Sequence, residues 1–304
     1  MRRLFDAYMI IDWSAASKPV TGANSIWIGM RAHNHRGAFV FTCENPPTRL
    51  LARQRILDIA RERIARGDRL LIGFDFALGY PAGTAAAMGF DTARCPPWRA
   101  MHTYLANHVI ETSTNANARF ALAAEMNAMI TKAAHPFWGA PKSGVTRTLA
   151  PKKGDFGIGS VLPEHRLSET WIRSTFTARP KSVWQLLGAG SVGSQALLGI
   201  PVVKYLQDEL DATKLWPFET GFRSLEPRDL DQVTCVIAEV YPSTVSVTPR
   251  AGEIFDCAQV RTLGEHFESL DTAGQLSSAF APPDGLSARE IHRITTEEGW
   301  ILAK

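Results

Sequence analysis

Three acidic residues stand out because each lies at or near the end of an apolar run that could form a buried strand. They are Asp12 after residues 8–11, Asp75 after residues 70–74, and Glu239 after residues 233–238. A charge at the end of a buried strand is costly unless it is paired or holds a metal ion. Carboxylate oxygens are the ligands that hard cations such as Mg²⁺ prefer, and two such ions can activate water against a phosphodiester. The residue types therefore predict a centre for Mg²⁺ or Mn²⁺.

Each acid also has a simpler interpretation. Asp12 could cap the turn at Ser14–Ser17, and Asp75 could cap the loop that follows it. Glu239 precedes Tyr241-Pro242-Ser243 and could pair with a surface arginine. Capping is the commoner role for one such acid alone, whereas three acids at equivalent positions favour a shared site.

A sheet is needed to bring these acids together. Apolar runs predict strands at residues 8–11, 25–30, 38–42, 70–76 and 233–240. Short connections make the first three an antiparallel meander, and a helix at 47–66 predicts a right-handed crossover to the fourth. The prediction is an α/β core of three meander strands plus two parallel strands. All three acids would then emerge beyond the carboxyl ends of the parallel strands, where open α/β sheets bind ligands.

The stretch between the fourth and fifth strands has a looser pattern. We expect residues 1–82 to form the first part of the core and 83–230 to be an insertion of helices and loops. Residues 231–304 would supply the last core strand and C-terminal helices. Within the insertion, residues 100–110 and 118–132 have helical patterns, as do residues 256–270 and 287–299 near the end of the chain.

Composition excludes several classes of protein. The formal net charge of +3 over 304 residues is too small for a protein that coats nucleic acid without regard to sequence, but it is compatible with a local basic groove. The four cysteines share no CxxC spacing, which argues against a zinc site and a disulfide framework, and Cys235 reads as a buried free thiol. No apolar stretch is long enough for a membrane span, and no secretory signal is evident. We therefore expect a cytoplasmic protein without a membrane partner.

Several motifs together resemble the domain-of-unknown-function family numbered 429, which is described as predicted RNase H-like nucleases. The motifs that carry the resemblance are Ile11-Asp12-Trp13-Ser14-Ala15-Ala16, Gly73-Phe74-Asp75-Phe76-Ala77-Leu78-Gly79-Tyr80-Pro81, Arg119-Phe120 with Glu125 and Asn127, Pro136-Phe137-Trp138-Gly139, Lys181-Ser182-Val183-Trp184-Gln185-Leu186-Leu187-Gly188, Gly199-Ile200-Pro201, Ala238-Glu239-Val240-Tyr241-Pro242-Ser243 and Glu297-Glu298-Gly299-Trp300-Ile301. They extend over most of the chain, and each is short.

The resemblance implies an RNase H-like fold and metal-dependent phosphodiester cleavage of a nucleic acid or nucleotide. It implies that Asp12, Asp75 and Glu239 are catalytic and hold the metal. Such folds take a further acid from a late helix, for which Asp271 is the candidate, followed by Glu268 and Asp256. The segment after Asp271 is a poor helix and departs from the family pattern, so the fourth acid is the weakest part of the prediction.

Two other readings compete. The segment Gly188–Gly193 matches GxGxxG, the dinucleotide-binding fingerprint, but the motif needs a strand before it and an uninterrupted helix after it. Gly199 and Pro201 are expected to break that helix, and Asp208 and Glu209, at the spacing of a ribose-binding acid, lie in a helical-looking segment. The second reading is a non-catalytic or nucleotide-binding module, because a fold alone does not fix a function.

Some further side chains could contact a phosphate or a base. The candidates for phosphate are Lys18, Lys142, Lys152, Lys153, Lys181, Arg99 and Arg119, each of which could equally be a solvated surface residue. Trp13 could stack on a base, although packing is the simpler role. His135 precedes Pro136-Phe137-Trp138 and also reads as packing.

Overall fold

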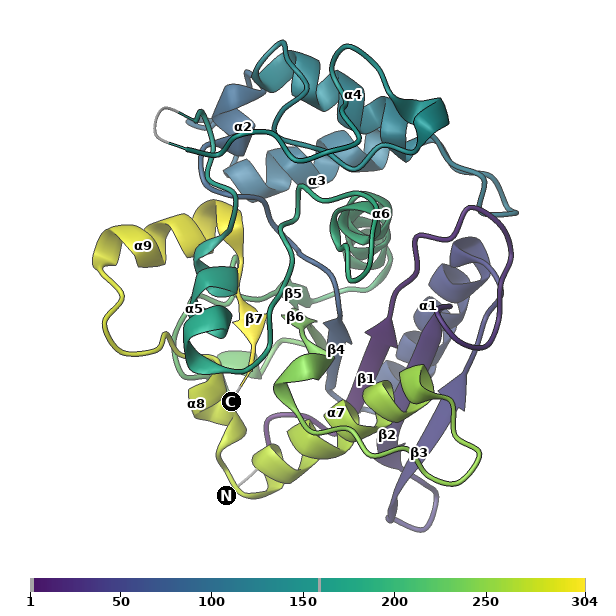
Figure 1. Cartoon of the computed structure of the whole chain (residues 1–304). Coiled ribbons are helices and arrows are strands. Elements are labelled where there is room, and N and C mark those ends of the chain that lie inside the picture. The colour runs from purple at the N-terminus through teal and green to yellow at the C-terminus, as the bar shows by residue number, and fades with distance from the viewer. Residues whose placement is uncertain (1–2, 158–159, 304) are drawn as a thin grey trace.

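A computed structural model describes residues 3–157 and 160–303 of the chain (Figure 1). In that part of the chain a seven-stranded mixed sheet is flanked by helices. The strands are β1 (Ala7–Asp12), β2 (Trp27–His33), β3 (Phe39–Glu44), β4 (Leu70–Phe74), β5 (Thr213–Leu215), β6 (Cys235–Val240) and β7 (Ile301–Leu302). The α-helices are α1 (Arg49–Ala65), α2 (Thr84–Ala87), α3 (Pro97–His108), α4 (Arg119–Ile130), α5 (Leu167–Thr175), α6 (Gly193–Glu209), α7 (Phe255–Thr272), α8 (Leu276–Ala279) and α9 (Ala288–Arg293). Single turns of other helix types are η1 (Lys142–Gly144), η2 (Pro227–Leu230), η3 (Pro242–Thr244) and η4 (Ile294–Glu298).

The strand order is β3-β2-β1-β4-β6-β5, with β7 paired to β6. The first three strands pair antiparallel, and β4 and β6 continue the sheet parallel to β1. This confirms the predicted meander followed by two parallel strands. The two short parallel strands β5 and β7 were not predicted, because runs of three and two residues carry no periodic pattern.

The three central strands are buried on both faces, so their side chains alternate between two packed layers. One face packs on α7, where Ile10 and Leu71 meet Val260. The other face packs on α1 and α6, where Ile11 and Phe74 lie in one apolar cluster with Ile56. The layer to which a residue points is therefore fixed by its parity along the strand.

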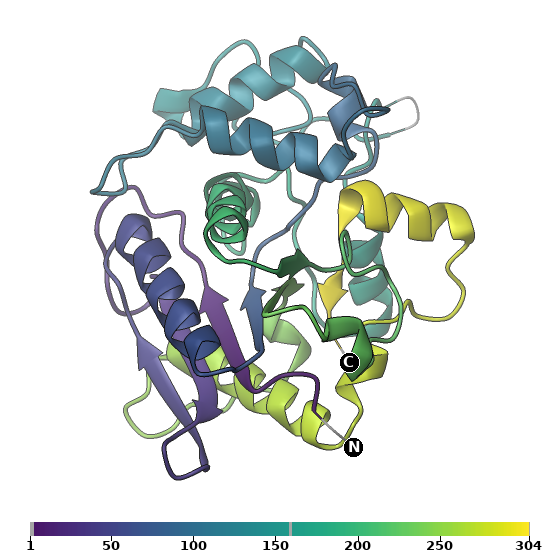
Figure 2. The same ribbon diagram turned by 180° about the vertical axis from the view of Figure 1, so that it is seen from behind.

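Helix α6 lies between the sheet and the layer formed by α3 and α4, as Figure 2 shows from behind. The expectation that Gly199 and Pro201 would break this helix is wrong, since α6 is continuous through both residues. Gly199 is needed for packing, because a Cβ there would lie 2.3 Å from Cζ of the buried Phe76. The close packing of α6 on Phe76, two residues after the end of β4, offsets the poor helix propensity of these two residues.

The segment expected as an insertion contributes to the same apolar cluster as the strands. Leu105 of α3, Leu122 of α4 and Leu197 of α6 are buried together with Met9 and Ile72 of the sheet. The expected helices at 100–110, 118–132 and 256–270 correspond to α3, α4 and α7. Among the described residues, no helix is long and apolar enough to cross a membrane.

Candidate metal centre

The carboxyl ends of β1 and β4 bring Asp12 and Asp75 together. In the parallel register of these strands, Ile11 is the partner of Phe74, so the acids that follow are neighbours on the same face. Their carboxyl groups share a hydrogen bond. The backbone N–H of Trp13 donates to Oδ1 of Asp75 at 2.8 Å, which fixes the orientation of that carboxyl group.

Burial and neighbouring acids dominate the electrostatics of the pair. Burial raises the pKa of Asp12, and the nearby Asp75 and Asp256 raise it further. Burial also raises the pKa of Asp75, against the lowering effect of hydrogen bonds from Trp13 and Asp12. No positively charged side chain of the described residues is among the groups that shift either pKa. The pair therefore shares a proton more readily than two separated aspartates would.

Asp256 approaches the pair from the first turn of α7, which packs against β1 and β2. Its Oδ2 accepts a 2.6 Å hydrogen bond from the backbone N–H of Asn24, in the loop between β1 and β2. The next residue, Cys257, places its Sγ 2.8 Å from Sγ of Cys43 on β3. These contacts hold the start of α7 at the acid pair, so the late helix supplies an acid from its N-terminal end.

Glu239 does not join Asp12 and Asp75, which corrects the expected convergence of the three acids. In the register of β4 and β6, Glu239 is the partner of Phe74 and not of Asp75. A shift of one residue along a strand turns the side chain to the opposite face. Glu239 is buried there, and both its oxygens accept hydrogen bonds from Arg166, at 2.6 and 2.7 Å. Leu78 donates to Oε2 of Glu239 at 3.1 Å.

Asp271 lies in the last turn of α7, at the opposite end of that helix from Asp256. Its carboxyl group accepts hydrogen bonds from the backbone N–H groups of Leu4 and Phe5, each at 2.9 Å, and from the Tyr8 hydroxyl at 2.7 Å. The structure therefore does not bring Asp271 to the acid pair. Glu268, the second choice, forms ion pairs with Arg3 and Arg31. Of the three acids considered on the late helix, Asp256 is the one beside Asp12.

The signal that distinguishes Asp256 in the sequence is its place in the first turn after Ile254. An 18-residue helix such as α7 separates its two ends by about 27 Å at a rise of about 1.5 Å per residue. Only one end can therefore reach the carboxyl edge of the sheet. The direction in which the helix crosses the sheet decides which end reaches that edge. The local sequence pattern does not predict this direction.

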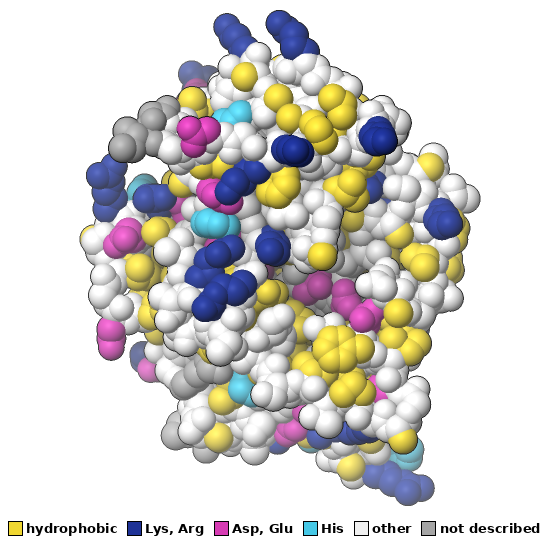
Figure 3. All heavy atoms as spheres, viewed as in Figure 1, with side chains coloured by type: hydrophobic (Ala, Val, Ile, Leu, Met, Phe, Trp, Pro, Cys, Tyr) yellow, Lys and Arg dark blue, Asp and Glu magenta, His cyan; other side chains and the backbone are white. Residues whose placement is uncertain are grey.

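A pocket of about 450 Å³ opens beside these acids. Asp12 and Asp256 line one part, and other lining residues come from the loop at 186–191 and the first turn of α6. Figure 3 shows acidic side chains gathered in the hollowed centre of this face, over the upper ends of β1 and β4. Among the described residues, no three His, Cys, Asp or Glu side chains are close enough to hold a metal as they stand. The centre is thus an acid pair with a third acid nearby.

The glycine-rich loop reaches this pocket without the surroundings of a dinucleotide site. In the described chain no strand directly precedes Gly188, since Gln185 makes only an isolated bridge with Trp138. Gly193 lets the start of α6 pack closely on the backbone of residue 183, because a Cβ at position 193 would lie 2.4 Å from the Val183 carbonyl oxygen. Asp208 pairs with Lys204, and Glu209 pairs with Arg61. The two acids at the spacing expected for a ribose-binding residue therefore form ion pairs with other side chains.

Four of the other candidates for ligand contact have structural partners. Arg99 pairs with Glu219, and Lys153 pairs with Glu164. The His135 ring packs against Phe156, with ring centroids 4.4 Å apart. Trp13 is only 1% exposed and packs against Phe74 and Phe76, so it is not available to stack on a base.

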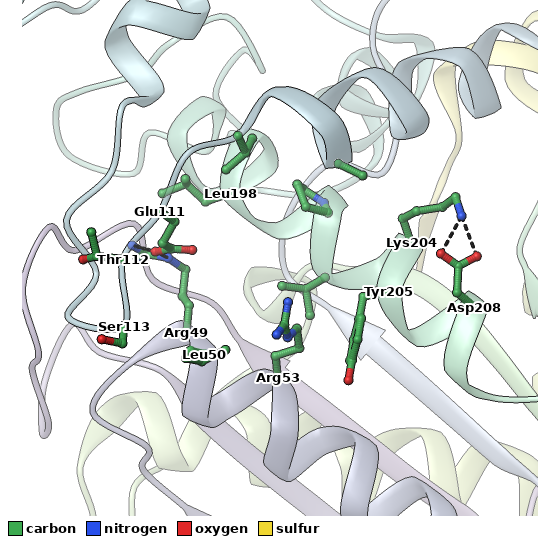
Figure 4. A pocket seen from close by; sticks show the side chains of 14 residues that line it. Arg49, Leu50, Arg53, Glu111, Thr112, Ser113, Leu198, Lys204, Tyr205 and Asp208 are labelled. Carbon is green, nitrogen blue, oxygen red and sulfur yellow. Dashed lines mark hydrogen bonds and ion pairs between the residues drawn. The ribbon is translucent and has the colours of Figure 1, made fainter.

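A second pocket, of about 410 Å³, lies between α1, α6 and the segment after α3 (Figure 4). Its charged groups already have partners, because Arg49 pairs with Glu111 and Lys204 pairs with Asp208. Arg53 lies over the ring of Tyr205, at 4.2 Å from its centroid. This pocket has no unpaired acid cluster, so the first pocket is the better candidate for chemistry.

Comparison of the chain with models of protein families, with curated proteins and with solved structures gave no match in any of the three. The resemblance to family 429 therefore rests on the motifs themselves.

Proposed function

We propose that this protein is a metal-dependent phosphoester hydrolase with an RNase H-like fold. The observation that carries the proposal is the pair Asp12 and Asp75, at the ends of adjacent parallel strands, with Asp256 close by. Among the described residues no cationic side chain is one of the groups that shift the pKa of either aspartate. The strand order supports the fold assignment, because a three-strand meander followed by parallel strands is the arrangement that the resemblance implies.

The donor set fits a hard divalent cation such as Mg²⁺ or Mn²⁺, which prefers carboxylate oxygens together with water. Asp12 and Asp75 would hold it, with Asp256 as the nearest further oxygen donor. A bound divalent ion supplies an activated water molecule and stabilises charge on the phosphate oxygens. The chain orients these ligands through two backbone donors, the N–H of Trp13 to Asp75 and that of Asn24 to Asp256.

Replacement of Asp75 by asparagine tests the proposal directly. Asp75→Asn removes one of the two charges while it keeps the size of the side chain. We expect the affinity for Mn²⁺, measured by calorimetry, to fall and the rate of hydrolysis to drop by about 100-fold or more. This loss exceeds the effect expected for a residue that only orients a metal ligand. The substrates are bis(p-nitrophenyl) phosphate and a panel of RNA, DNA and branched oligonucleotides. Circular dichroism melting reports whether the fold is retained.

Asp208→Asn is the matched control, because Asp208 lies on the surface of α6, where it pairs with Lys204. It should leave both metal binding and hydrolysis unchanged. Equal metal-dependent hydrolysis by the Asp75 variant and the unaltered protein would overturn the mechanism.

A binding module without catalysis is the second candidate. The observation that favours it is that no three potential ligands are close together among the described residues. In that case mononucleotides would bind with the same affinity to Asp75→Asn and to the unaltered protein, and no substrate of the panel would be cleaved.

A further inference from the structure

Arg119 is a buried cation in the wall of the pocket that contains Asp12. Its side chain is only 9% exposed, and the hydrogen bonds it donates go to neutral groups. They reach Oγ of Ser194 at 2.9 Å, Oγ of Ser17 at 2.9 Å and Oδ1 of Asn117 at 2.8 Å. In the described part of the chain no carboxylate forms an ion pair with Arg119. Burial, with a further effect of the nearby Arg49, lowers the pKa of Arg119 to about 10, against the raising effect of Glu111, which pairs with Arg49. The guanidinium also lies over the Phe120 ring, 4.4 Å from its centroid.

A guanidinium buried among neutral partners is costly, because such charges are ordinarily paired. It remains protonated at neutral pH even with the lowered pKa. The contacts of Arg119 hold it in one orientation, since Ser194 belongs to α6 and Ser17 to the loop after β1. These contacts use Nε and Nη1, so an oxyanion in the pocket would supply negative charge and accept hydrogen bonds from Nη2.

Other donors face the same pocket. The first turn of α6 leaves backbone N–H groups without partners inside the helix, and Ser194 and Gln195 of this turn line the pocket. Gly190, with a φ of 70°, makes the loop turn, and the exposed Lys181 lies beside it. Arg119, a buried cation in the wall of the pocket, thus supplies an indication of a ligand that is independent of the helix terminus.

The size and charge of the pocket restrict the kind of anion. Arg119 is the only basic side chain among the described residues that line it, so there is one charged contact for one phosphate. A duplex binder needs many such contacts along a basic face. A volume of about 450 Å³ is in the range of sites for small molecules, which extend over about 300–1,000 Å³.

We propose that Arg119, Ser191 and the first turn of α6 form a subsite for the phosphate group of a small, mononucleotide-sized phosphate ester, beside Asp12 and Asp256. The inference deepens the proposed function and rests on it in one respect, namely that the bound phosphate is that of the substrate. Phosphate binding itself does not require the metal.

The test is calorimetric titration of the metal-free protein with inorganic phosphate and with a nucleoside monophosphate. Arg119→Met removes the cation, and we expect affinity for both to fall by about tenfold or more, the effect of losing a hydrogen bond to a charged group. Ser191→Asp is the second variant, because Ser191 is half-buried in a loop and the substitution leaves the core intact. Its carboxylate would neutralise Arg119 and repel phosphate, with a similar loss. Arg99→Met is the matched control and should bind like the unaltered protein, since Arg99 already pairs with Glu219.

The outcomes are distinguishable. Phosphate affinity that is unchanged in both Arg119→Met and Ser191→Asp overturns the subsite. Tight binding and cleavage of long oligonucleotides, without binding of the monophosphate, overturns the assignment of a small ester. Phosphate binding that depends on Arg119, in a protein that fails to bind Mn²⁺ or to hydrolyse any ester, supports the subsite and overturns the proposed function alone.

Discussion

The acids of this protein differ in role because their immediate neighbours differ. Asp12 and Asp75 face each other and form no ion pair with a described residue, whereas Glu239 has Arg166 as a bidentate partner. Arg166 also donates from Nε to Glu169 at 3.0 Å, so one buried arginine serves two buried glutamates. Glu239 thus fits a structural role, and its local environment is that of an ion pair.

Replacement of Glu239 by glutamine separates these roles. Loss of one partner of a buried ion pair costs about 3–5 kcal/mol, and we expect the low end because Arg166 retains Glu169. Urea denaturation should show this loss in the free energy of unfolding, while Mn²⁺ affinity stays unchanged. A Glu239→Gln variant with intact stability and no Mn²⁺ binding would show that Glu239 is a ligand after all. The Arg166→Met and double variants complete a mutant cycle and isolate the pairwise energy.

At the scale of elements, two helices position the site from opposite faces of the sheet. α7 brings Asp256 to the ends of the strands, and α6 brings Ser194 and Gln195 to the pocket. The Gln195 side chain donates a hydrogen bond to the Trp13 carbonyl oxygen, which connects α6 to the loop after β1. The distance of α6 from the sheet therefore matters for the pocket as well as for stability.

Gly199→Ala tests this close packing. The added Cβ would overlap the ring of Phe76, which is fully buried and cannot move without repacking its neighbours. We expect the free energy of unfolding to fall by about 1–3 kcal/mol, as measured in urea, and phosphate affinity to weaken as α6 shifts.

Gly264→Ala in the middle of α7 is the control, because its Cβ would meet Arg31 Cβ at 3.4 Å and Ile10 Cγ1 at 3.7 Å, both ordinary contacts. It should be neutral or stabilise the protein by up to about 1 kcal/mol, as alanine replaces a helical glycine. Equal effects of the two substitutions on the free energy of unfolding would show that the contact of α6 with Phe76 does not restrict the residue at position 199.

At the scale of the whole molecule, one buried histidine couples the fold to acidic pH. His102 on α3 is fully buried, and its Nε2 must donate to the Leu78 carbonyl oxygen, 2.8 Å away. Nδ1 has no hydrogen-bond partner among the residues that the structure describes, so protonation would bury an unsatisfied charged donor. Burial accordingly lowers the pKa of His102 from 6.5 to about 4.

The sign of the effect on stability follows from this lowered pKa. The unfolded chain binds the proton near pH 6.5 and the folded chain only near pH 4, so neutral His102 stabilises the fold fully above pH 6.5. This contribution, roughly 3 kcal/mol, is lost as the pH falls through that window. His102→Gln keeps a donor for Leu78 without a titrating group. The difference in free energy of unfolding between the two proteins should shrink between pH 7 and pH 4, and a constant difference would contradict the prediction.

Much of the fold could be predicted from the local sequence. Continuous apolar runs marked β1, β4 and β6, because strands buried on both faces need apolar residues throughout. Helical spacing marked α1, α3, α4 and α7. The continuity of α6 through Gly199 and Pro201 could not be predicted, since it depends on Phe76, more than 100 residues earlier in the chain.

Part of the site could also be predicted from the local sequence. The sequence by itself determined which acids end buried strands, and it indicated Asp12 and Asp75 as candidates. The tertiary structure decided that Glu239 faces the other layer and that Asp256, at the near end of α7, is the acid that approaches. An apolar run buried on both faces carries no mark of its register, and a shift of one residue reverses every side chain. Register and helix direction are set by long-range packing, so only the folded chain assigns the third acid.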